Sequence, residues 1–247
     1  PAVWAVQYPL WSLVGPDEWD LYNNGLQSWD TPEALRALEY SAALRDAGLW
    51  PTTFSTMTID EFHLYFHTQR RACMMFIPTW YTGRSFAPQA SGGQDPDWHF
   101  GMLRYPAWED GAANDTLWVT FESGYSVIST SAHPDVAGDI LAFASQPKYG
   151  ALWTAVTNSP AAIRYDSETD WPSDELLDEL GVVPGQWNWY WDEFNRVYSD
   201  MPVAVGATTR CGDFSAAVAG VLNEGLPLGL LSVDEAVDML NDALCIE

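Results

Sequence analysis

The sequence predicts a layered α/β protein. Helical patterns alternate with single strand patterns along the chain, which favours this class over a helical bundle or a β-sandwich. With 247 residues, 47% of them apolar, the chain is long enough to build a substantial core. We find no internal repeat and no uninterrupted apolar run of about 18 residues, the length that a membrane-spanning helix needs.

Capping motifs predict the starts of three helices. The segment Asp30-Thr31-Pro32-Glu33 combines an N-cap, a proline suited to a first helical turn and a capping glutamate, and Gly48 ends the pattern. Thr58-Ile59-Asp60-Glu61 repeats this logic for a second helix, and Ser232-Val233-Asp234-Glu235 does so for the last one. Apolar residues recur at helical spacing after each cap, so each helix is expected to bury one face.

Strand patterns lie between the helices. The apolar run from Ala72 to Ile77 follows the second helix and stops at Pro78, so we expect a strand there. A short strand is expected from Phe100 to Arg104. A longer strand region runs from Leu117 to Thr130 and is interrupted by Gly124.

Three more helices are expected in the second half of the chain. His133-Pro134-Asp135 opens one of them, and an acidic, turn-rich stretch from Ser159 to Gln186 comes later. Closely spaced tryptophans at 187, 189 and 191 mark the next helix, and the stretch from Phe214 to Asn223 is helical in pattern.

Acidic residues dominate the charge of the chain. There are 34 Asp and Glu against ten Lys and Arg, a net charge of −24, and Lys148 is the only lysine. Nucleic acids and anionic lipids bind clustered cations, so both are excluded as partners. Because the excess is spread along the chain, a solvated surface suited to salty surroundings explains it better than a local acidic site.

The cysteines and histidines do not form a recognisable metal or redox motif. Cys73 lies within an apolar run and is expected to be a buried small hydrophobe. Cys211 and Cys245 are candidates for a disulfide in an oxidising compartment. His63 and His67 share a helix face at the spacing that zinc sites use, but the rest of a ligand set is missing, so no metal and no other cofactor is expected.

Several segments, in this order, resemble family 1 extracellular solute-binding proteins of ABC transporters, the class that includes maltodextrin-binding proteins. The stretch Arg71-Ala72-Cys73-Met74-Met75-Phe76-Ile77-Pro78-Thr79-Trp80 resembles the family signature of a basic residue, two small residues, Met, three residues, Gly or Pro, one residue and Trp. Further similar segments are Gly101 to Pro106, Gly124 to Ser129, His133 to Ala137, Met201-Pro202 and the final capped helix. Arg70 departs from the family, which usually has Gly there.

The resemblance implies a periplasmic-binding-protein-like fold of type II, with two α/β lobes. Residues 1–112 and 168–247 would form the C-terminal lobe, and residues 113–167 would be a piece of the N-terminal lobe. Most of that N-terminal lobe has no counterpart in this sequence, and the first ten residues already read like the inside of a domain. We therefore expect a missing N-terminal segment or a second chain to complete the lobe and cover its sheet edge.

The implied function is that of the non-enzymatic, extracytoplasmic substrate-binding component of an ABC importer, periplasmic or lipid-anchored at the cell surface, with a membrane permease as partner. Its ligand would be a sugar or oligosaccharide held between the lobes, because sugars need aromatic faces for stacking and the chain has 14 tryptophans. Trp80 matches the ligand-stacking tryptophan of the family. The expected ligand-binding residues are Trp80, Tyr8, Trp11, Tyr81, Glu122, Tyr125, Arg210 and Phe214.

Other interpretations stay open. Simple packing explains Tyr8 and Trp11 equally well, while a surface ion pair for Arg210 and a core position for Phe214 are slightly favoured. The acidity would also suit a binding protein for a cationic small molecule such as a polyamine, with carboxylates among the aromatic residues. A glycoside-active enzyme would need two carboxylates roughly 5 to 10 Å apart, and acidic pairs such as Glu109-Asp110 are expected by coincidence in so acidic a chain.

Overall fold

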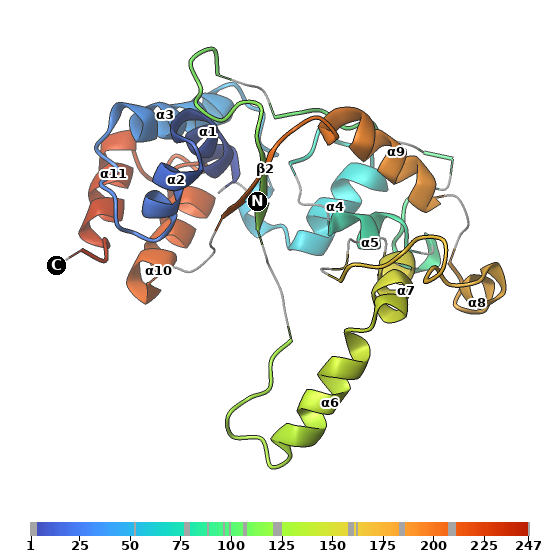
Figure 1. The fold of residues 1–247 in the computed structure, drawn as a ribbon. Coiled ribbons are helices and arrows are strands. Elements are labelled where there is room, and N and C mark those ends of the chain that lie inside the picture. Colours follow the sequence, from blue (N-terminus) through green and yellow to red (C-terminus); the bar gives the residue numbers. More distant parts are fainter. Residues whose placement is uncertain are drawn as a thin grey trace. The chain divides into compact units, whose positions relative to one another are not determined.

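The computed structural model describes residues 4–51, 53–76, 80–87, 89–95, 97–98, 100–105, 108–120, 125–157, 161, 163–182, 186–206 and 211–246. The fold is predominantly helical (Figure 1). Contacts within the chain define two compact units, each assembled from separate segments. Unit 1 contains Pro1–Ile59, Leu103–Glu122 and Val197–Glu247, and unit 2 contains Asp60–Met102 and Ser123–Arg196.

Unit 1 holds most of the regular elements. They are α1 (Trp4–Val14), α2 (Pro16–Asn23), α3 (Pro32–Asp46), the 3-10 turn η1 (Phe54–Thr56), β1 (Leu117–Thr120), β2 (Val203–Gly206), α10 (Gly212–Gly220), the π-helical turn η3 (Val221–Gly225) and α11 (Val233–Asp242). Unit 2 holds α4 (Ile59–His67), α5 (Tyr81–Ser85), the 3-10 turn η2 (Gln89–Ser91), α6 (Pro134–Ala144), α7 (Pro147–Thr157), α8 (Asp174–Glu179) and most of α9 (Gln186–Tyr198).

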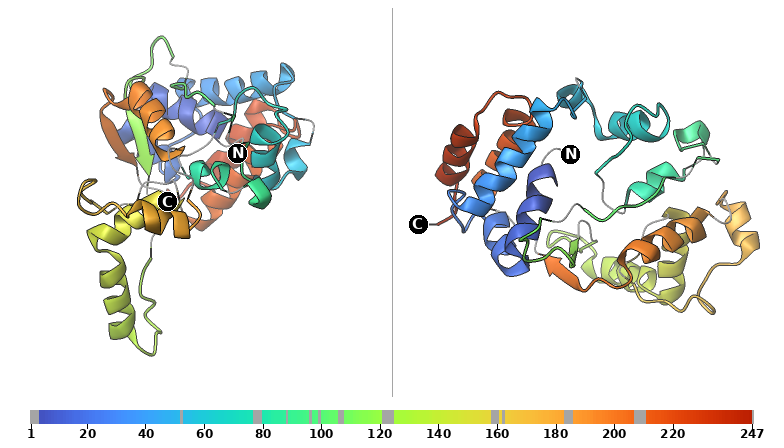
Figure 2. Two further views of the ribbon diagram at one scale, coloured as in Figure 1. Left: turned by 90° about the vertical axis from the view of Figure 1, so that its right-hand side faces the viewer. Right: turned by 90° about the horizontal axis from the view of Figure 1, so that it is seen from above.

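The core of unit 1 joins the first helices of the chain to the last. Leu10 from α1, Leu38 from α3 and Leu240 from α11 are fully buried in one hydrophobic cluster with Trp19 and Phe214. Both views in Figure 2 show the early helices (blue) beside the late ones (red). Burial of these large side chains is the main force that holds the two ends of the sequence together.

The expected helices are confirmed where a local cap predicts them. Thr31 accepts a hydrogen bond from the backbone N–H of Ala34 at 3.2 Å, and proline occupies the first turn of α3. At α11, Ser232 and Glu235 form the complete capping box that the sequence predicts. The helices expected after His133 and over residues 187–191 are also present, as α6 and α9.

The α/β fold class is wrong. Among the described residues, the strands are only β1 and β2, which pair in parallel from Leu117 opposite Val203 to Thr120 opposite Gly206. Residues 72–76 and 100–104, both within segments expected to be strands, have no strand structure, and Ile77 at the end of the first segment lies outside the described residues. The described part of the region expected from residue 117 to 130 supplies only the four residues of β1. A two-lobe fold of type II has a sheet in each lobe, so the helical architecture overturns that prediction.

The apolar run before Pro78 shows why the strand prediction fails. Its hydrophobic composition satisfies a strand pattern, but a strand also needs a neighbour that supplies hydrogen bonds. The described part of the run has no such neighbour, and Met74 is 75% exposed. Cys73 is exposed as well, so its expected burial is also wrong.

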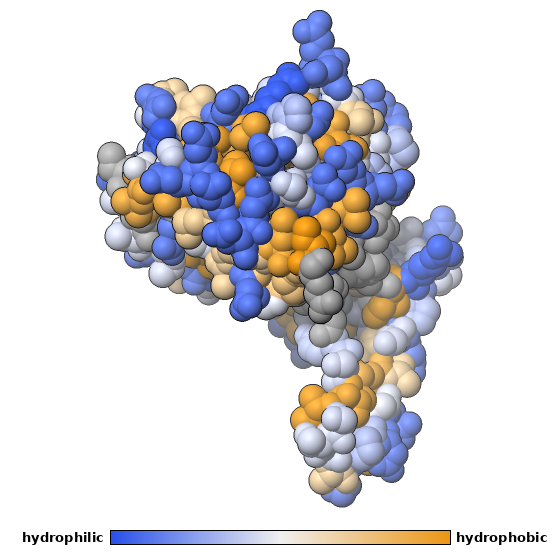
Figure 3. Space-filling model, turned by 90° about the vertical axis from the view of Figure 1, so that its left-hand side faces the viewer, coloured by the Kyte–Doolittle hydropathy of each residue, from blue (hydrophilic) through white to orange (hydrophobic). Residues whose placement is uncertain are grey.

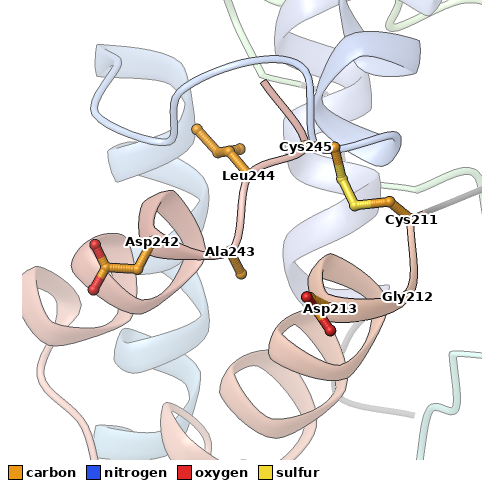
Figure 4. A pocket seen from close by; sticks show the side chains of 7 residues that line it. All are labelled: Cys211, Gly212, Asp213, Asp242, Ala243, Leu244 and Cys245. Carbon is orange, nitrogen blue, oxygen red and sulfur yellow. A yellow bond between two sulfur atoms is a disulfide. The ribbon is translucent and has the colours of Figure 1, made fainter. Parts of the chain in front are cut away.

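A disulfide closes the C-terminal part of unit 1. Cys211, which precedes α10, is bonded to Cys245, which follows α11, so the candidate pair is confirmed (Figure 4). The backbone N–H of Cys245 also donates to the carbonyl of Gly25 at 2.8 Å. Gly25 has a φ of +69°, and a Cβ there would lie 2.8 Å from the ring of Phe214, so this close approach requires glycine.

In unit 2, α4 and α5 pack through aromatic and histidine side chains, whereas α6 has no buried residue.

Within the part of the chain that the structure describes, no helix has both the length and the apolar character needed to cross a membrane.

Candidate functional site

Four of the eight predicted site residues fall into two aromatic clusters, one in each unit. Tyr8 and Trp11 lie on α1 in unit 1. Trp80 and Tyr81 lie at the start of α5 in unit 2. Because each cluster belongs to one unit, each can be described as a candidate site by itself.

The first cluster is centred on Trp118 of β1, and we call it the Tyr8 cluster. The Trp118 ring lies 5.2 Å from the Tyr8 ring and 5.2 Å from the Trp19 ring, edge to face in both cases. It stacks on Trp11 at 6.4 Å, and Tyr8 in turn stacks on Tyr105 at 5.9 Å. These are the stacked and edge-to-face geometries that aromatic pairs prefer.

Exposure changes across the Tyr8 cluster. Trp11 and Trp19 are buried and belong to the core of unit 1. Tyr8, Tyr105 and Trp118 are only half-buried. The cluster therefore has an outer edge of three half-buried rings, which pack against two buried rings that cannot move easily.

Hydroxyl groups lie beside this outer edge. The Tyr105 side chain is hydrogen-bonded to Tyr40, and burial, followed by the nearby Tyr40, raises the pKa of the Tyr105 hydroxyl. The Tyr40 ring meets the Trp108 ring edge to face at 5.7 Å, and the Arg36 guanidinium lies 4.2 Å above the same indole. The raised pKa keeps Tyr105 neutral, so it serves as a hydrogen-bonding group rather than as an acid or base.

Arg36 also pairs with an acidic side chain, Asp110. Its Nη1 donates to both carboxylate oxygens of Asp110 at 2.8 Å. This hydrogen bond is the largest cause of a pKa of Asp110 below its ordinary value. Asp110 is therefore ionised and already paired.

Several indoles of the Tyr8 cluster have unused donors. The Nε1 atoms of Trp11, Trp19 and Trp118 are buried and have no hydrogen-bond partner among the described residues. An unpaired buried donor typically costs about 1–3 kcal/mol. The Trp118 ring is half-buried, but its N–H lies on the buried side of the ring.

The second cluster surrounds His63 and His67 of α4, and we call it the histidine cluster. His67 Nε2 lies 2.9 Å from the carbonyl oxygen of Gly92, which can only accept, so Nε2 carries the proton. His67 Nδ1 then accepts from the Tyr81 hydroxyl at 2.7 Å. This assigns one neutral tautomer to His67, and burial is the main cause that lowers its pKa.

His63 has no polar contact of this kind. It is 2% exposed, and neither ring nitrogen has a hydrogen-bond partner within the described structure. The Tyr81 ring lies 4.9 Å away and the Trp80 ring 5.4 Å away. Burial, then the neighbouring His67 and Arg84, lower the pKa of His63 to about 4.

Comparisons with family models, with curated proteins and with solved structures find no match to this chain. The resemblance to solute-binding proteins stays a prediction that rests on the sequence segments quoted above.

The remaining predicted residues lie elsewhere. Tyr125 is 80% exposed, with its ring 6.5 Å from the Trp153 ring, and Phe214 is fully buried in the core of unit 1. Glu122 and Arg210 lie outside the described residues. Trp80 is half-buried, whereas Tyr81 is buried.

Sequence reasoning missed Tyr105 and Trp118, although both are central to the Tyr8 cluster. Each lies in a segment that was expected to border or form a strand, and neither carries a motif. Their role depends on contact with α1, nearly a hundred residues away along the chain, and only the fold reveals that contact.

A shallow pocket beside the disulfide offers different chemistry. Figure 4 shows it between the start of α10 and the end of α11, lined by Cys211, Gly212, Asp213, Asp242, Ala243, Leu244 and Cys245. It has two carboxylates but no aromatic ring, so it lacks the stacking surface that a sugar requires.

Among the described residues, no three side chains of the metal-binding types converge on one point. His63 and His67 are surrounded by aromatic rings, and His67 uses both nitrogens for hydrogen bonds. The two histidines therefore pack unit 2 together and do not form a metal centre.

Proposed function

We propose that this chain is a non-enzymatic binding protein for an uncharged, hydroxyl-bearing small molecule, with a sugar as the favoured ligand. The observation that carries the proposal is the outer edge of the Tyr8 cluster, where the half-buried rings of Tyr8, Tyr105 and Trp118 are packed together. A sugar presents patches of C–H groups that stack on such rings, and its hydroxyls need neutral hydrogen-bonding groups nearby.

The polar groups beside this edge favour a neutral ligand. The Tyr40 and Tyr105 hydroxyls are hydrogen-bonded to each other, and a hydroxyl can both donate and accept. They match hydroxyl groups better than they match a cation or an anion.

The alternatives of a cationic ligand and of glycoside hydrolysis have less support. A cation would need an available carboxylate near the rings, and one candidate, Asp110, is already paired with Arg36. A glycosidase acid needs a raised pKa, whereas the pKa of Asp110 is lowered. No second function is proposed.

An extracytoplasmic location is part of the proposal. Disulfides such as Cys211–Cys245 persist mainly in oxidising compartments, which supports that location. Delivery of the ligand to a membrane permease is supported by the sequence resemblance alone, and the proposed binding surface does not depend on it.

Calorimetric titration with a panel of mono- and oligosaccharides tests the ligand class. At least one sugar is expected to bind the wild-type protein and to change its tryptophan fluorescence. Failure of every sugar to bind would refute the assignment of a sugar ligand.

Variants of Tyr8 test the surface. Tyr8→Ala removes a stacking plane worth about 0.5–1.5 kcal/mol, so the affinity should fall up to about tenfold, whereas Tyr8→Phe should retain binding. Tyr165→Ala is the matched control, because Tyr165 also pairs with a tryptophan, Trp171, at 6.1 Å in unit 2. If Trp80→Ala abolishes binding while Tyr8→Ala has no effect, the ligand surface belongs to unit 2 and the proposed site is wrong.

A further inference from the structure

An apolar helix face in unit 2 is left uncovered. Val136, Ile140 and Phe143 of α6 are 51%, 62% and 55% exposed, and none of the 11 residues of the helix is buried. Their spacing of four and three residues places them on one side of the helix, which we call the α6 face. Figure 3 shows apolar residues in orange along this helix, in the lower part of the view.

The segments next to α6 add more exposed apolar side chains. Tyr125, Val127 and Ile128 precede the helix and are all exposed, as are Trp153 and Val156 of α7. A single exposed apolar residue is ordinary, but a run of them along one helix and its flanks is typical of a surface that another molecule covers. A helix of this kind normally buries its apolar stripe.

Charge decides which occupant fits the α6 face. Asp135 and Asp139 are both exposed and lie four residues apart, so they form one edge of the helix beside Phe143. The helix itself has no basic residue, and Lys148 lies beyond its C-terminal end, over the Tyr149 ring. One edge of the apolar face is therefore acidic.

We propose that the α6 face is a docking surface for a basic protein partner. The partner would pack an apolar face, such as that of an amphipathic helix, against Val136, Ile140 and Phe143, and lysines or arginines beside that face would pair with Asp135 and Asp139. Such an arrangement uses apolar contacts for affinity and charges for specificity and orientation.

Two other occupants fit less well. A second copy of this chain would bring one net charge of −24 against another, so long-range repulsion opposes it. A phospholipid surface, if anionic, would be repelled by the same charge. A basic partner turns the charge into an attraction.

A pair of synthetic amphipathic helical peptides tests the proposal with the complete chain. One peptide has a leucine face and lysines elsewhere, and the other has the same leucines with glutamates in place of lysines. Fluorescence anisotropy at about 0.15 M salt, where weak surface attraction is screened, should detect binding of the lysine peptide and not of the glutamate peptide.

Substitutions on the α6 face separate docking from general attraction to an acidic protein. The double variant Ile140→Asn with Phe143→Asn should weaken binding of the lysine peptide about tenfold or more, since central apolar residues dominate such interfaces. Leu230→Asn is the matched control, because Leu230 is a 69% exposed apolar residue of unit 1, and it should leave binding unchanged. Asp135→Asn with Asp139→Asn should weaken binding and reduce its dependence on salt.

Three results would overturn the proposal. Equal binding of the lysine peptide to the wild type and to the double variant Ile140→Asn with Phe143→Asn would mean that only net charge attracts the peptide. Dimerisation in sedimentation velocity that the double variant loses would identify a second copy as the occupant. Co-sedimentation with phosphatidylcholine vesicles that the double variant loses would identify a membrane surface. Because the substituted side chains are exposed, the variant should keep the wild-type circular dichroism spectrum, which checks its folding.

Discussion

Acidification is expected to destabilise the protein through His63. In the folded chain this histidine is buried among the rings of Trp80 and Tyr81, with no partner found for either nitrogen among the described residues. Protonation would place a charge in this apolar setting. The pKa of His63 is accordingly lowered from 6.5 to about 4, first by burial and then by His67 and Arg84.

The effect on stability depends on the difference between the pKa of His63 in the unfolded chain, 6.5, and its pKa in the folded chain, about 4. Above pH 6.5 the histidine is neutral in both the folded and the unfolded chain, so it does not change stability. Between pH 6.5 and about 4 the unfolded chain takes up the proton first, so the free energy of unfolding falls as the pH is lowered. At roughly 1.4 kcal/mol for each pH unit, the loss reaches about 3 kcal/mol near pH 4.

Urea unfolding followed by circular dichroism at pH 7 and pH 4 measures this loss. His63→Phe keeps an aromatic ring in the pocket but cannot titrate, so it should be less sensitive to acid than wild type by about 3 kcal/mol. His133→Gln is the control, because His133 is exposed and lies outside the ring cluster that encloses His63. The carboxylates titrate alike in all three proteins and cancel in the comparison.

The result that refutes this reasoning is an equal loss of stability for wild type and His63→Phe between pH 7 and pH 4. In that case His63 either titrates normally in the folded chain or is not enclosed by the aromatic rings.

Three further changes test the fold of unit 1. Replacing Cys211 and Cys245 together by serine should lower the free energy of unfolding, measured with urea, by up to about 4 kcal/mol, because the bond spans 34 residues. The control Cys73→Ser removes a free cysteine and should have no effect. Equal effects of the two changes would refute the role of the disulfide. Ser232→Ala removes the capping box of α11 and should destabilise by about 1 kcal/mol, visible as a lower melting temperature; an unchanged melting temperature would contradict this. Gly25→Ala places a Cβ at a position with a positive φ and little free space, so it should destabilise the protein by about 1–3 kcal/mol in the same assay. A stabilised protein would show that the loop relaxes to accept the Cβ.

The sequence predicts helices well where the signal is local. The caps at Thr31 and Ser232 and the helix opened by Pro134 need only neighbouring residues, and each is present. Strands need a distant partner, which a single apolar run does not specify, so the prediction fails for residues 72–76. The helix α1 is missed for a different reason: Pro9 lies inside it and argues against a helix, although Trp4, Tyr8 and Trp11 recur at helical spacing.

The candidate site is predictable only in part. Tyr8 and Trp11 are identified together because they are close in sequence, and the structure places both in the Tyr8 cluster. Trp118 and Tyr105 join them through contacts between distant segments, so no local pattern points to them. Likewise His63 and Trp80 each attract notice in the sequence, but only the packing of α4 near α5 shows that they touch.

The discontinuous make-up of unit 1 sets the order in which the protein can fold during synthesis. The helices α1 and α3, which pack on each other, are translated before α10, η3 and α11, which complete the core that all of them share. Until those later helices are made, part of the apolar surface of α3 is open to chaperones or to misassociation. Truncation before α11 would therefore leave α3 without one of its packing partners, and the bond between Cys211 and Cys245 can lock the unit only after translation of the second cysteine.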